Sequence, residues 1–442
     1  MKEKESFVKL CASLCNFVKF LFTLRNTENI HSQISQEEIK NLSKEYDQLV
    51  YLNSNSKEQS SLLAIGQKAI FIPKENQVFD GLKEFVGEHQ DWVFGYLSYD
   101  LKNEVEPSLS SNNKDEINFP LAHFFVPQFV LEISLDSTVL HFHTTDEKEE
   151  FLSFLSKKKS NKGKMQQKTT FSQRMSKDNY GQRFEAIKEH IQQGDIYEMN
   201  FCHEFYANNV EINPFETYLK LNELTNAPFS AFYKNKTQYI LSASPERYIK
   251  KEGSKLTTQP IKGTAKRGKT DEEDEATREE LSANEKERSE NIMIVDLVRN
   301  DLSKTAKKGS VKVEELCKVY TFETVHQMIS TVTSEVKENT HPVEVLRTTF
   351  PMGSMTGAPK VEAMKIIEEV ETTKRGVYSG SVGYFTPDGD FDFNVIIRTL
   401  LYNETNKNLS FMVGGAITSK ANVEDEYEET LLKAEAMINC LK

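Results

Sequence analysis

The chain has 442 residues and a mass of 50.7 kDa, enough for one large domain or for two to three ordinary ones. Its 55 Lys and Arg residues against 67 Asp and Glu residues give a net charge of −12 at pH 7, and this balance disfavours non-specific binding to nucleic acid, which needs basic charge. The sequence has no run of about 18 uncharged apolar residues, which argues against a membrane-spanning helix.

The N-terminal region and the cysteines bear on where the protein works. Residues 7–24 are fairly apolar, but Lys9 and Lys19 interrupt them and no small-residue cleavage site follows. We therefore expect an amphipathic helix or a non-native extension there rather than a signal peptide. The five cysteines are odd in number and form no C-x-x-C pair, so we expect free thiols in a reducing compartment. We predict a cytoplasmic protein.

Short β-branched and aromatic runs, separated by Asn, Ser, Gly and Pro, predict strands between Tyr46 and about Leu155. The runs are 48–52, 69–72, 92–99, 129–133 and 138–143. Residues 157–170 contain no apolar residue except Met165 and form the clearest linker. We therefore divide the chain into an extension (1–45), a β-rich subdomain (46–156), a linker (157–170) and a second, longer unit (171–442).

The longer unit mixes helices and strands in blocks. Apolar residues recur at helical spacing before Gly194 and predict a helix from about Ser176. Residues 378–385 and 391–402 flank a Pro-Asp-Gly turn and predict antiparallel neighbours, and 409–418 extends this meander. Because regular βαβ alternation is missing, we predict an α+β fold built on antiparallel sheets.

Two short motifs carry an acid and an amine. S-P-E-R at 244–247 contains Glu246 at the end of an apolar strand, although a solvated turn is the commoner meaning of such a motif. P-I-K-G-T at 260–264 contains Lys262 between an apolar residue and a glycine. A lysine held in a cavity there has a lowered pKa and a reactive amine, whereas a surface lysine beside a turn is the ordinary alternative.

A helix predicted over residues 284–304 places Glu290, Ile294, Leu297 and Asp301 on one face. Glu290 would therefore point toward the interior, where a carboxylate needs a cation. An ion pair with Arg288 and a metal ion are equally compatible with the sequence.

Two further segments follow. G-S-M-T-G-A-P-K at 353–360 runs into a predicted helix at 361–371 and offers an anion site at the helix start, although it does not match a P-loop. A C-terminal helix from about Asn422 carries Glu426, Glu429 and Lys433 on one polar face, after the Gly-Gly-Ala of 414–416. That face is either solvated or contributes carboxylates to a Mg²⁺ site.

Taken in this order, the motifs of residues 176–442 resemble the chorismate-utilising enzymes, which include anthranilate synthase component I, aminodeoxychorismate synthase component I, isochorismate synthase and salicylate synthase. Residues 91–100 (D-W-V-F-G-Y-L-S-Y-D) extend the resemblance more weakly. It implies large antiparallel sheets packed in a sandwich with helices on the outside. P-I-K-G-T is similar to the aminodeoxychorismate synthase members, whereas anthranilate synthases have P-I-A-G-T, and no Leu-Leu-Glu-Ser segment is present.

The resemblance implies a transferase that aminates chorismate at C4, giving 4-amino-4-deoxychorismate for 4-aminobenzoate and folate synthesis. It assigns Lys262 as the nucleophile that adds at C2 and Glu246 as the general acid. It assigns Glu290 and Glu429 as Mg²⁺ ligands, with Glu426 acting beside them or through water. The substrate-binding positions it implies are Gly263, Thr264, His326, Tyr378, Arg398, Gly414, Gly415, Ala416 and Lys433, and for His326 a hydrogen-bonded core histidine is the alternative.

The chemistry needs a neutral Lys262 and a protonated Glu246, so we expect burial to move both pKa values. Cys202, in N-F-C-H-E, lacks the glycines that shape a nucleophile elbow, and by resemblance ammonia comes from a separate glutamine amidotransferase subunit. Glu198 stands where the family resemblance leads us to expect glutamine.

Alternative functions stay open. Anthranilate synthase component I would aminate C2 and eliminate pyruvate, and an isochorismate or salicylate synthase would use water. A non-catalytic chorismate-binding subunit would not need the acid or the amine.

Overall fold

The computed structural model describes residues 25–30, 34–156, 168–323 and 325–442. The predicted helix or extension at 7–24 and most of the predicted linker (157–167) lie outside these residues. Within the described ranges, no helix is long and apolar enough to cross a membrane.

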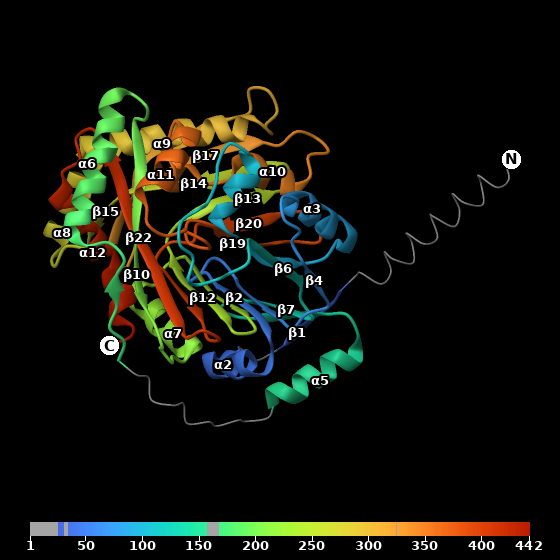
Figure 1. The fold of residues 1–442 in the computed structure, drawn as a ribbon. Helices are drawn as coiled ribbons and strands as arrows, with labels where there is room; N and C mark the ends of the chain where they lie inside the picture. The colour runs from blue at the N-terminus through green and yellow to red at the C-terminus, as the bar shows by residue number, and fades with distance from the viewer. Residues whose placement is uncertain (1–24, 31–33, 157–167, 324) are drawn as a thin grey trace.

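Two large antiparallel sheets form the framework, as the α+β prediction requires (Figure 1). The first sheet contains, in spatial order, β1 (Asn26–Ile30), β8 (Thr138–Phe142), β7 (Phe129–Ile133), β3 (Ser61–Ile65), β2 (Gln48–Asn53), β11 (Phe229–Asn235), β12 (Gln238–Ser244), β21 (Thr399–Asn403), β22 (Asn408–Thr418), β10 (Glu198–Ala207) and β18 (Gly357–Ala358), with β9 (Ser172–Gln173) also on β10. The second sheet contains β15 (Ile261–Lys266), β17 (Val325–Glu335), β14 (Lys255–Gln259), β13 (Arg247–Glu252), β20 (Phe391–Asn394), β19 (Ser381–Phe385), β5 (Val93–Leu97), β6 (Ala122–Val126) and β4 (Ala69–Phe71), with β16 (Lys312–Thr321) also on β17.

Both sheets combine strands from the two sides of the predicted linker. In the first sheet β2 pairs with β11, and in the second β5 pairs with β19. Residues 25–30 and 34–45, assigned above to an extension, also join the fold, because β1 pairs with β8 and α2 (Gln36–Glu45) packs on β2 and α7 (Pro214–Thr225). The segments on either side of the linker therefore share the same sheets.

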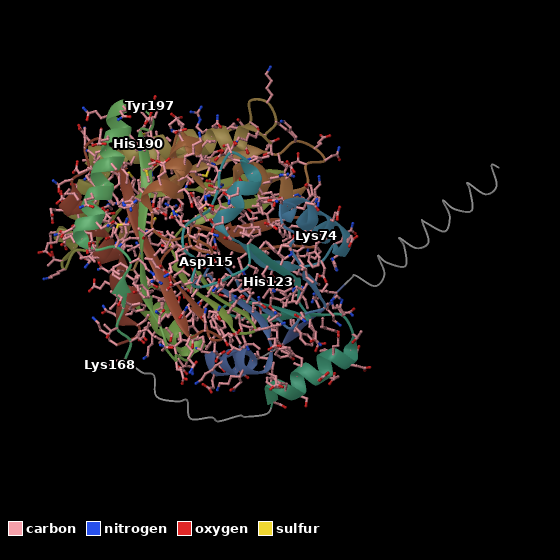
Figure 2. All side chains as sticks on the ribbon, in the orientation of Figure 1. Lys74, Asp115, His123, Lys168, His190 and Tyr197 are labelled. Carbon is pink, nitrogen blue, oxygen red and sulfur yellow. The ribbon has the colours of Figure 1, made fainter. Side chains whose placement is uncertain are left out.

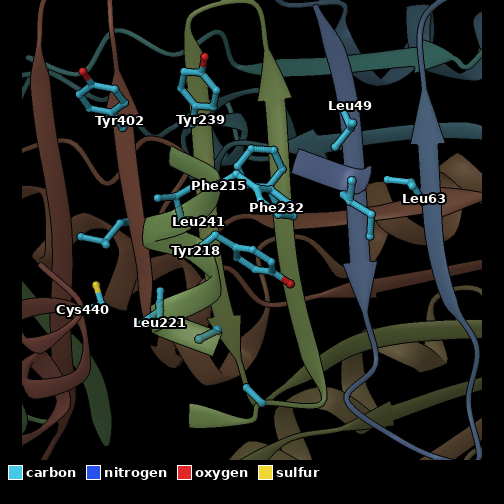
Figure 3. Packing of buried hydrophobic residues seen from close by; sticks show 14 of the residues in the cluster. Leu49, Leu63, Phe215, Tyr218, Leu221, Phe232, Tyr239, Leu241, Tyr402 and Cys440 are labelled. Carbon is cyan, nitrogen blue, oxygen red and sulfur yellow. The ribbon is translucent and has the colours of Figure 1, made fainter. Parts of the chain in front are cut away.

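Alternating side chains of the first sheet fill two cores. Val50 and Tyr233 belong to the core between the two sheets, whereas their neighbours Leu49 and Phe232 face the helices outside, as the two-residue period of a strand requires. Figure 3 shows the outer core, where Tyr218 of α7 lies close to Phe232. Burial on both faces explains why these strands are apolar almost throughout.

Helices cover the outer faces of the sandwich (Figure 1). Over the first sheet lie α2, α5 (Thr145–Ser156), α6 (Lys177–Gln193), α7, α11 (Lys360–Val370) and α12 (Val423–Asn439), and over the second lie α3 (Val78–His89), α8 (Asp271–Ala283), α9 (Glu285–Ser303) and α10 (Pro342–Thr349). The predicted helix before Gly194 is confirmed as α6. Ser176 caps its start and Gly194 ends it in the left-handed conformation, at φ 87°.

The predicted strand at 391–402 is in fact two strands. β19 and β20 pair antiparallel, as expected, but residues 395–398 leave the second sheet and β21 belongs to the first. Arg398 lies in this crossing with a φ of 49°. Apolar residues on both sides of the crossing, at 395–397 and 400–402, hid it, because such residues are equally compatible with one long buried strand.

Candidate active site

The site forms where the chain crosses twice between the sheets. Ser244 ends β12 in the first sheet and Arg247 begins β13 in the second, so Glu246 lies in one crossing, and residues 395–398 form the other. The two crossings are hydrogen-bonded to each other. The Val395 amide donates to the Glu246 carbonyl at 3.1 Å, and the Ala243 amide donates to the Arg398 carbonyl at 3.1 Å.

Glu246 is buried, and its carboxyl group is set up to hold a proton at neutral pH. Burial raises its pKa to about 7, although hydrogen bonds from Ser354 and the Ile261 amide and the charge of Lys262 work against that rise. A carboxyl group with a pKa near the working pH can donate a proton in the transition state. A pKa near neutrality is compatible with the role of general acid that the sequence predicts for Glu246.

Lys262 lies half-buried on β15, and its charge state differs from the prediction. Burial works to lower its pKa, but surrounding negative charges outweigh this effect and the pKa is raised. These charges belong to Glu198, Glu290, Glu246 and Glu287. The expectation of a lysine already neutralised by burial is therefore wrong for the unliganded protein, because burial among carboxylates favours the ammonium.

Glu198, which departs from the expected glutamine, is one of these carboxylates. It opens β10 with only 1% of its surface exposed, and its Oε2 atom has no hydrogen-bond partner among the described residues. Burial raises the pKa of Glu198, and the charge of Lys262 partly opposes the rise.

Glu290 points inward from α9, as the helical spacing predicts. It is buried together with Ile294 and Asp301 on the same face, and its Oε1 atom lacks a hydrogen-bond partner among the described residues. Burial raises its pKa to about 7. The ion pair with Arg288, the alternative to a metal ion, is not found within the described ranges, where the Arg288 guanidinium donates to the Ser282 carbonyl.

The other two predicted metal ligands are held by lysines. Glu426 Oε1 accepts from Lys286 Nζ at 2.8 Å, and Glu429 Oε1 lies 2.6 Å from Lys433 Nζ. Among the described residues no group of three metal-ligating side chains is already gathered closely enough to hold an ion.

The pKa of Lys286 nevertheless indicates that the three carboxylates lie within electrostatic reach of one cation. Burial works to lower the pKa of Lys286, but Glu426, followed by Glu290 and Glu429, raises it well above its ordinary value. A cation among three carboxylates, together with the orphaned Glu290 Oε1, is the donor chemistry that suits Mg²⁺, which prefers oxygen ligands.

Arg398 carries an uncompensated positive charge. Within the part of the chain that the structure describes, its guanidinium has no hydrogen-bond or ion-pair partner, and burial lowers its pKa. A buried cation without a partner costs free energy unless a ligand supplies the anion. The predicted role of Arg398 in binding a carboxylate fits this environment.

The predicted Gly-Gly-Ala segment forms part of β22 beside β10. Gly414, Gly415 and Ala416 pair with Cys202, Phe201 and Asn200 of β10. A Cβ atom at Gly415 would lie 3.1 Å from Glu426 Oε2, so glycine leaves space for the carboxylates of α12. Lys433 Nζ reaches back from α12 and donates to the Gly414 carbonyl at 2.9 Å.

The remaining predicted binding residues have different environments. Gly263 sits at an irregularity of β15 with a φ of 85°, a conformation that favours glycine, and the next residue, Thr264, is exposed. Tyr378 is buried with its hydroxyl 3.6 Å from Cys202 Sγ. His326 has the hydrogen bonds of a core histidine, since Nε2 lies 2.9 Å from Asp274 Oδ1 and Nδ1 lies 3.0 Å from Thr321 Oγ1.

Reasoning from the sequence missed two features of this site. Lys286, the cation among the three carboxylates, has no motif of its own, and the only signal was its position one turn before Glu290. The buried ion pair of Arg375 with Glu371 was also missed. Arg375 donates to the Asn200 carbonyl at 2.8 Å, and Glu371 accepts from the Cys202 amide at 2.9 Å, so the pair supports the site strand β10.

The chain is similar in sequence to proteins of one named family. A family profile described as chorismate binding enzyme matches residues 41–439. The chain is 34% identical over 370 residues to aminodeoxychorismate synthase component 1 of Bacillus subtilis (strain 168), covering 80% of this chain and 78% of that protein. It is 40% identical over 268 residues to the protein of the same name from Escherichia coli (strain K12), covering 61% of this chain and 58% of the relative.

Other relatives are longer or more distant. Aminodeoxychorismate synthase, chloroplastic, from Arabidopsis thaliana is 36% identical over 81% of this chain, which spans 41% of that protein. Among solved structures, anthranilate synthase component I from Streptococcus pneumoniae TIGR4 superposes with a TM-score of 0.76 at 26% identity, covering 86% of this chain and 92% of that one. The isochorismate synthase MenF of Escherichia coli has the same TM-score at 17% identity and shows the shared fold.

Proposed function

The chain belongs to the chorismate binding enzyme family, and from this premise we propose that it aminates chorismate at C4 to give 4-amino-4-deoxychorismate, in the synthesis of 4-aminobenzoate and folate. Relatives named aminodeoxychorismate synthase, at 34–40% identity, support this choice within the family. The observation that carries it is a lysine, Lys262, within electrostatic reach of a buried acid, Glu246, whose pKa is about 7.

In the proposed reaction the chain supplies the nucleophile and the acid. Neutral Lys262 Nζ forms a bond to ring carbon C2 while the C4–O bond breaks. Glu246 gives its proton to the departing hydroxyl, which leaves as water. Ammonia then bonds to C4 and the C2–Nζ bond breaks, so the amine of Lys262 is released and one proton returns from the new ammonium group to Glu246.

Substrate binding would rest on the positive side chains. Chorismate is a dianion, and Arg398 is a half-buried cation that lacks a partner among the described residues. A guanidinium can bind a carboxylate through two parallel hydrogen bonds. Lys433, half-buried beside Gly414, would supply a second positive charge.

We also propose a Mg²⁺ ion in the site. Glu290 and Glu429 would hold it, with Glu426 acting beside them, and the bound ion would supply positive charge to the ring carboxylate of chorismate. The orphaned Oε1 atom of Glu290 and the oxygen-only donor set support this assignment.

Ammonia would come from a separate glutamine amidotransferase subunit. The three cysteines within the described ranges (Cys202, Cys317, Cys440) are buried, and burial raises the pKa of the Cys202 thiol to about 12, which is unsuitable for a glutaminase nucleophile. Free thiols also support a reducing compartment, and we propose the cytoplasm.

The test is a product analysis. The purified chain is incubated with chorismate, MgCl₂ and an ammonium salt, without a partner, and the product is identified by mass spectrometry and by conversion to 4-aminobenzoate with an added lyase. We expect a product in which an amino group has replaced the C4 hydroxyl, and no such product from the Lys262→Ala variant. Anthranilate would contradict C4 amination while leaving the family intact. An inactive chain that stays inactive with an amidotransferase and glutamine would indicate a binding subunit.

A further inference from the structure

Arg375 is a buried arginine that the reaction proposed above does not use. It is 3% exposed, and its guanidinium binds Glu371 at two points, with Nε donating to Oε2 at 2.9 Å and Nη2 donating to Oε1 at 2.6 Å. The same guanidinium donates to the Asn200 carbonyl at 2.8 Å and to the Met355 carbonyl at 2.5 Å. One side chain therefore joins β10, the residue that ends α11 and the loop at 353–356.

The ion pair completes one edge of β10. Tyr197, which is labelled in Figure 2 and is 69% exposed, precedes this strand. Away from β22, the strand pairs with β18 near its start and with β9 near its end. Between them the Asn200 carbonyl accepts from Arg375, and the Cys202 amide donates to Glu371 Oε1 at 2.9 Å. The two side chains thus supply the donor and the acceptor that a neighbouring strand would supply.

The same stretch of β10 supports the predicted substrate-binding segment on its other edge. Residues 200–202 pair with residues 414–416 of β22, which form the Gly-Gly-Ala segment. Lys433 Nζ donates to the Gly414 carbonyl at 2.9 Å, so this predicted binding lysine is attached to the same segment. The ion pair therefore fixes the strand on which substrate binding depends.

The loop that Arg375 contacts lies beside the predicted general acid. Met355 follows Ser354, and Ser354 and Glu246 line one small cavity, in which the serine hydrogen-bonds the carboxyl group. Asn200 ties the same loop to β10 a second time, because its side-chain amide donates to the Ser354 carbonyl at 3.4 Å. The contacts of Arg375 therefore set the separation between the acid and the substrate-binding strand.

The N-terminal half of the chain supports this arginine. The Arg375 guanidinium lies over the Tyr99 ring, 4.7 Å from its centroid. The next residue, Gly376, donates from its amide to Asp100 Oδ2 at 3.0 Å and accepts from the Tyr99 amide at 2.8 Å. Residues 91–100, which contain no predicted site residue, thereby contact the framework of the site.

Stability alone is a weak explanation for this arrangement. Replacing a buried ion pair with well-packed apolar side chains is often neutral or stabilising. A guanidinium, however, presents its N–H donors in a rigid planar fork, whereas a lysine ammonium carries all its donors on one nitrogen. Only the fork can bind Glu371, Asn200 and Met355 at the same time.

We propose that Arg375 is a positioning residue of the amination site, which holds the loop beside Glu246 and the substrate-binding strand at a fixed separation. This inference rests on the proposed function and deepens it, because the separation matters only if Glu246 gives its proton to the bound substrate. A general acid must lie within hydrogen-bond reach of the departing oxygen. An error of about 1 Å in such geometry can lower the rate about 100-fold.

The first test is the Arg375→Lys variant, which keeps the positive charge beside Glu371 but loses the fork. The kinetics of C4 amination are measured with chorismate, MgCl₂ and an ammonium salt. We expect kcat to fall on the order of 100-fold while KM for chorismate changes by less than about 3-fold, because the substrate moves together with its binding strand. A KM effect as large as the kcat effect would overturn the proposal.

Arg174→Lys is the matched control. The Arg174 guanidinium also pairs with a carboxylate of β10, since Nε lies 3.0 Å from Glu204 Oε2, but this pair is near the other end of the strand. This variant should keep the kcat of the wild type. Equal kcat values for Arg375→Lys and Arg174→Lys would contradict the positioning role.

A double-mutant cycle with Ser354→Ala separates positioning from a general loss of stability. If Arg375 acts through the loop that carries Ser354, the loss of kcat in the double variant is smaller than the product of the two single losses. Independent effects multiply, and that outcome would overturn the proposal. Circular dichroism and urea unfolding establish that each variant is folded under the assay conditions.

Two further arms complete the experiment. Glu371→Asp keeps the charge but shortens the carboxylate, so it should also lower kcat more than it changes KM, and it replaces Arg375→Lys if that variant does not fold. If the wild-type chain does not aminate C4, the proposed function fails and the inference falls with it. If the wild type aminates C4 and the variants at 371 and 375 keep its kcat, the inference alone fails.

Discussion

At the scale of single residues, the site is defined by charges whose partners are incomplete. Arg398 is a half-buried cation without a described partner, while Glu198 and Glu290 are buried carboxylates that each have one oxygen without a partner among the described residues. The buried Arg375, by contrast, is paired with Glu371. Such unpaired charges cost stability and are expected where a substrate or a metal ion completes the pairing.

Arg398 gives a prediction in which stability and binding change in opposite directions. Arg398→Met removes a cation whose burial is uncompensated, so the thermal midpoint of the substrate-free protein should rise. The KM for chorismate should rise about 10- to 100-fold, because a charge-assisted hydrogen bond contributes about 1.5–3 kcal/mol.

Arg247→Met is the matched control, because that guanidinium already pairs with Asp392 at 3.0 Å. Loss of Arg247 leaves the half-buried Asp392 carboxylate without this partner and should lower the thermal midpoint. Differential scanning fluorimetry and steady-state kinetics measure both effects. A lower midpoint in Arg398→Met would show that a partner satisfies this guanidinium in the free protein.

The sequence was sufficient to predict the acid and the amine but not the charge on the amine. The S-P-E-R motif alone favoured a solvated turn, and only the family resemblance led us to expect a buried Glu246, whose pKa of about 7 is compatible with the role proposed for it. The state of Lys262 depends on carboxylates from β10, α9 and α12, which are far apart in the chain. No local sequence pattern indicates the combined effect of these carboxylates on the pKa of Lys262.

At the scale of elements, one ion pair fixes the segment that supports Glu246. Lys360, at the start of α11, pairs with Asp301 near the end of α9 and also donates to the Thr349 and Pro351 carbonyls at 3.1 and 2.8 Å. The loop between these points carries Ser354, which hydrogen-bonds Glu246. Lys360, the lysine of the 353–360 motif, therefore stabilises the start of α11 and the loop before it.

Removal of Lys360 should be far more destabilising than removal of its exposed neighbour. Lys360→Met leaves Asp301 buried, and breaking such a pair costs about 3–5 kcal/mol. Lys304→Met removes a second lysine from the same carboxylate, but that side chain is 45% exposed, so the loss should be about 1 kcal/mol or less. Urea unfolding measures both free energies, and equal values for the two variants would contradict this account.

Elements with strong local signals were predicted well, and those defined by tertiary pairing were not. Helix α6 has its cap residues and period in the sequence, and β7 matches the predicted run at 129–133. The crossing at 395–398 has no such signal, since whether a buried strand stays in one sheet depends on its partners.

At the scale of the whole molecule, the buried carboxyl groups should make stability depend on pH. Burial raises the pKa values of Glu246 and Glu290 from 4.5 to about 7, so between these values the folded state binds more protons than the unfolded state. Stability should then fall as pH rises through this range, by up to about 3 kcal/mol for each group.

Denaturant unfolding in EDTA at pH 5.5 and pH 8 tests this expectation. The double variant Glu246→Gln/Glu290→Gln should have a shallower pH dependence than the wild type, and an identical slope would contradict the assignment. Mg²⁺ should raise the midpoint more at pH 8 than at pH 5.5, because the ion and the proton compete for Glu290.

Both sheets combine strands from early and late parts of the chain, and this arrangement determines when the protein can fold during synthesis. During synthesis β2 must wait for β11, some 180 residues later, and β5 must wait for β19, almost 290 residues later. Neither sheet can be completed before its C-terminal strands have been synthesised. Apolar strands that are buried on both faces in the folded protein therefore stay exposed in the nascent chain. Chains that terminate before β19 lack strands of both sheets, and we expect them to require chaperones and to be degraded rather than to accumulate as a folded half.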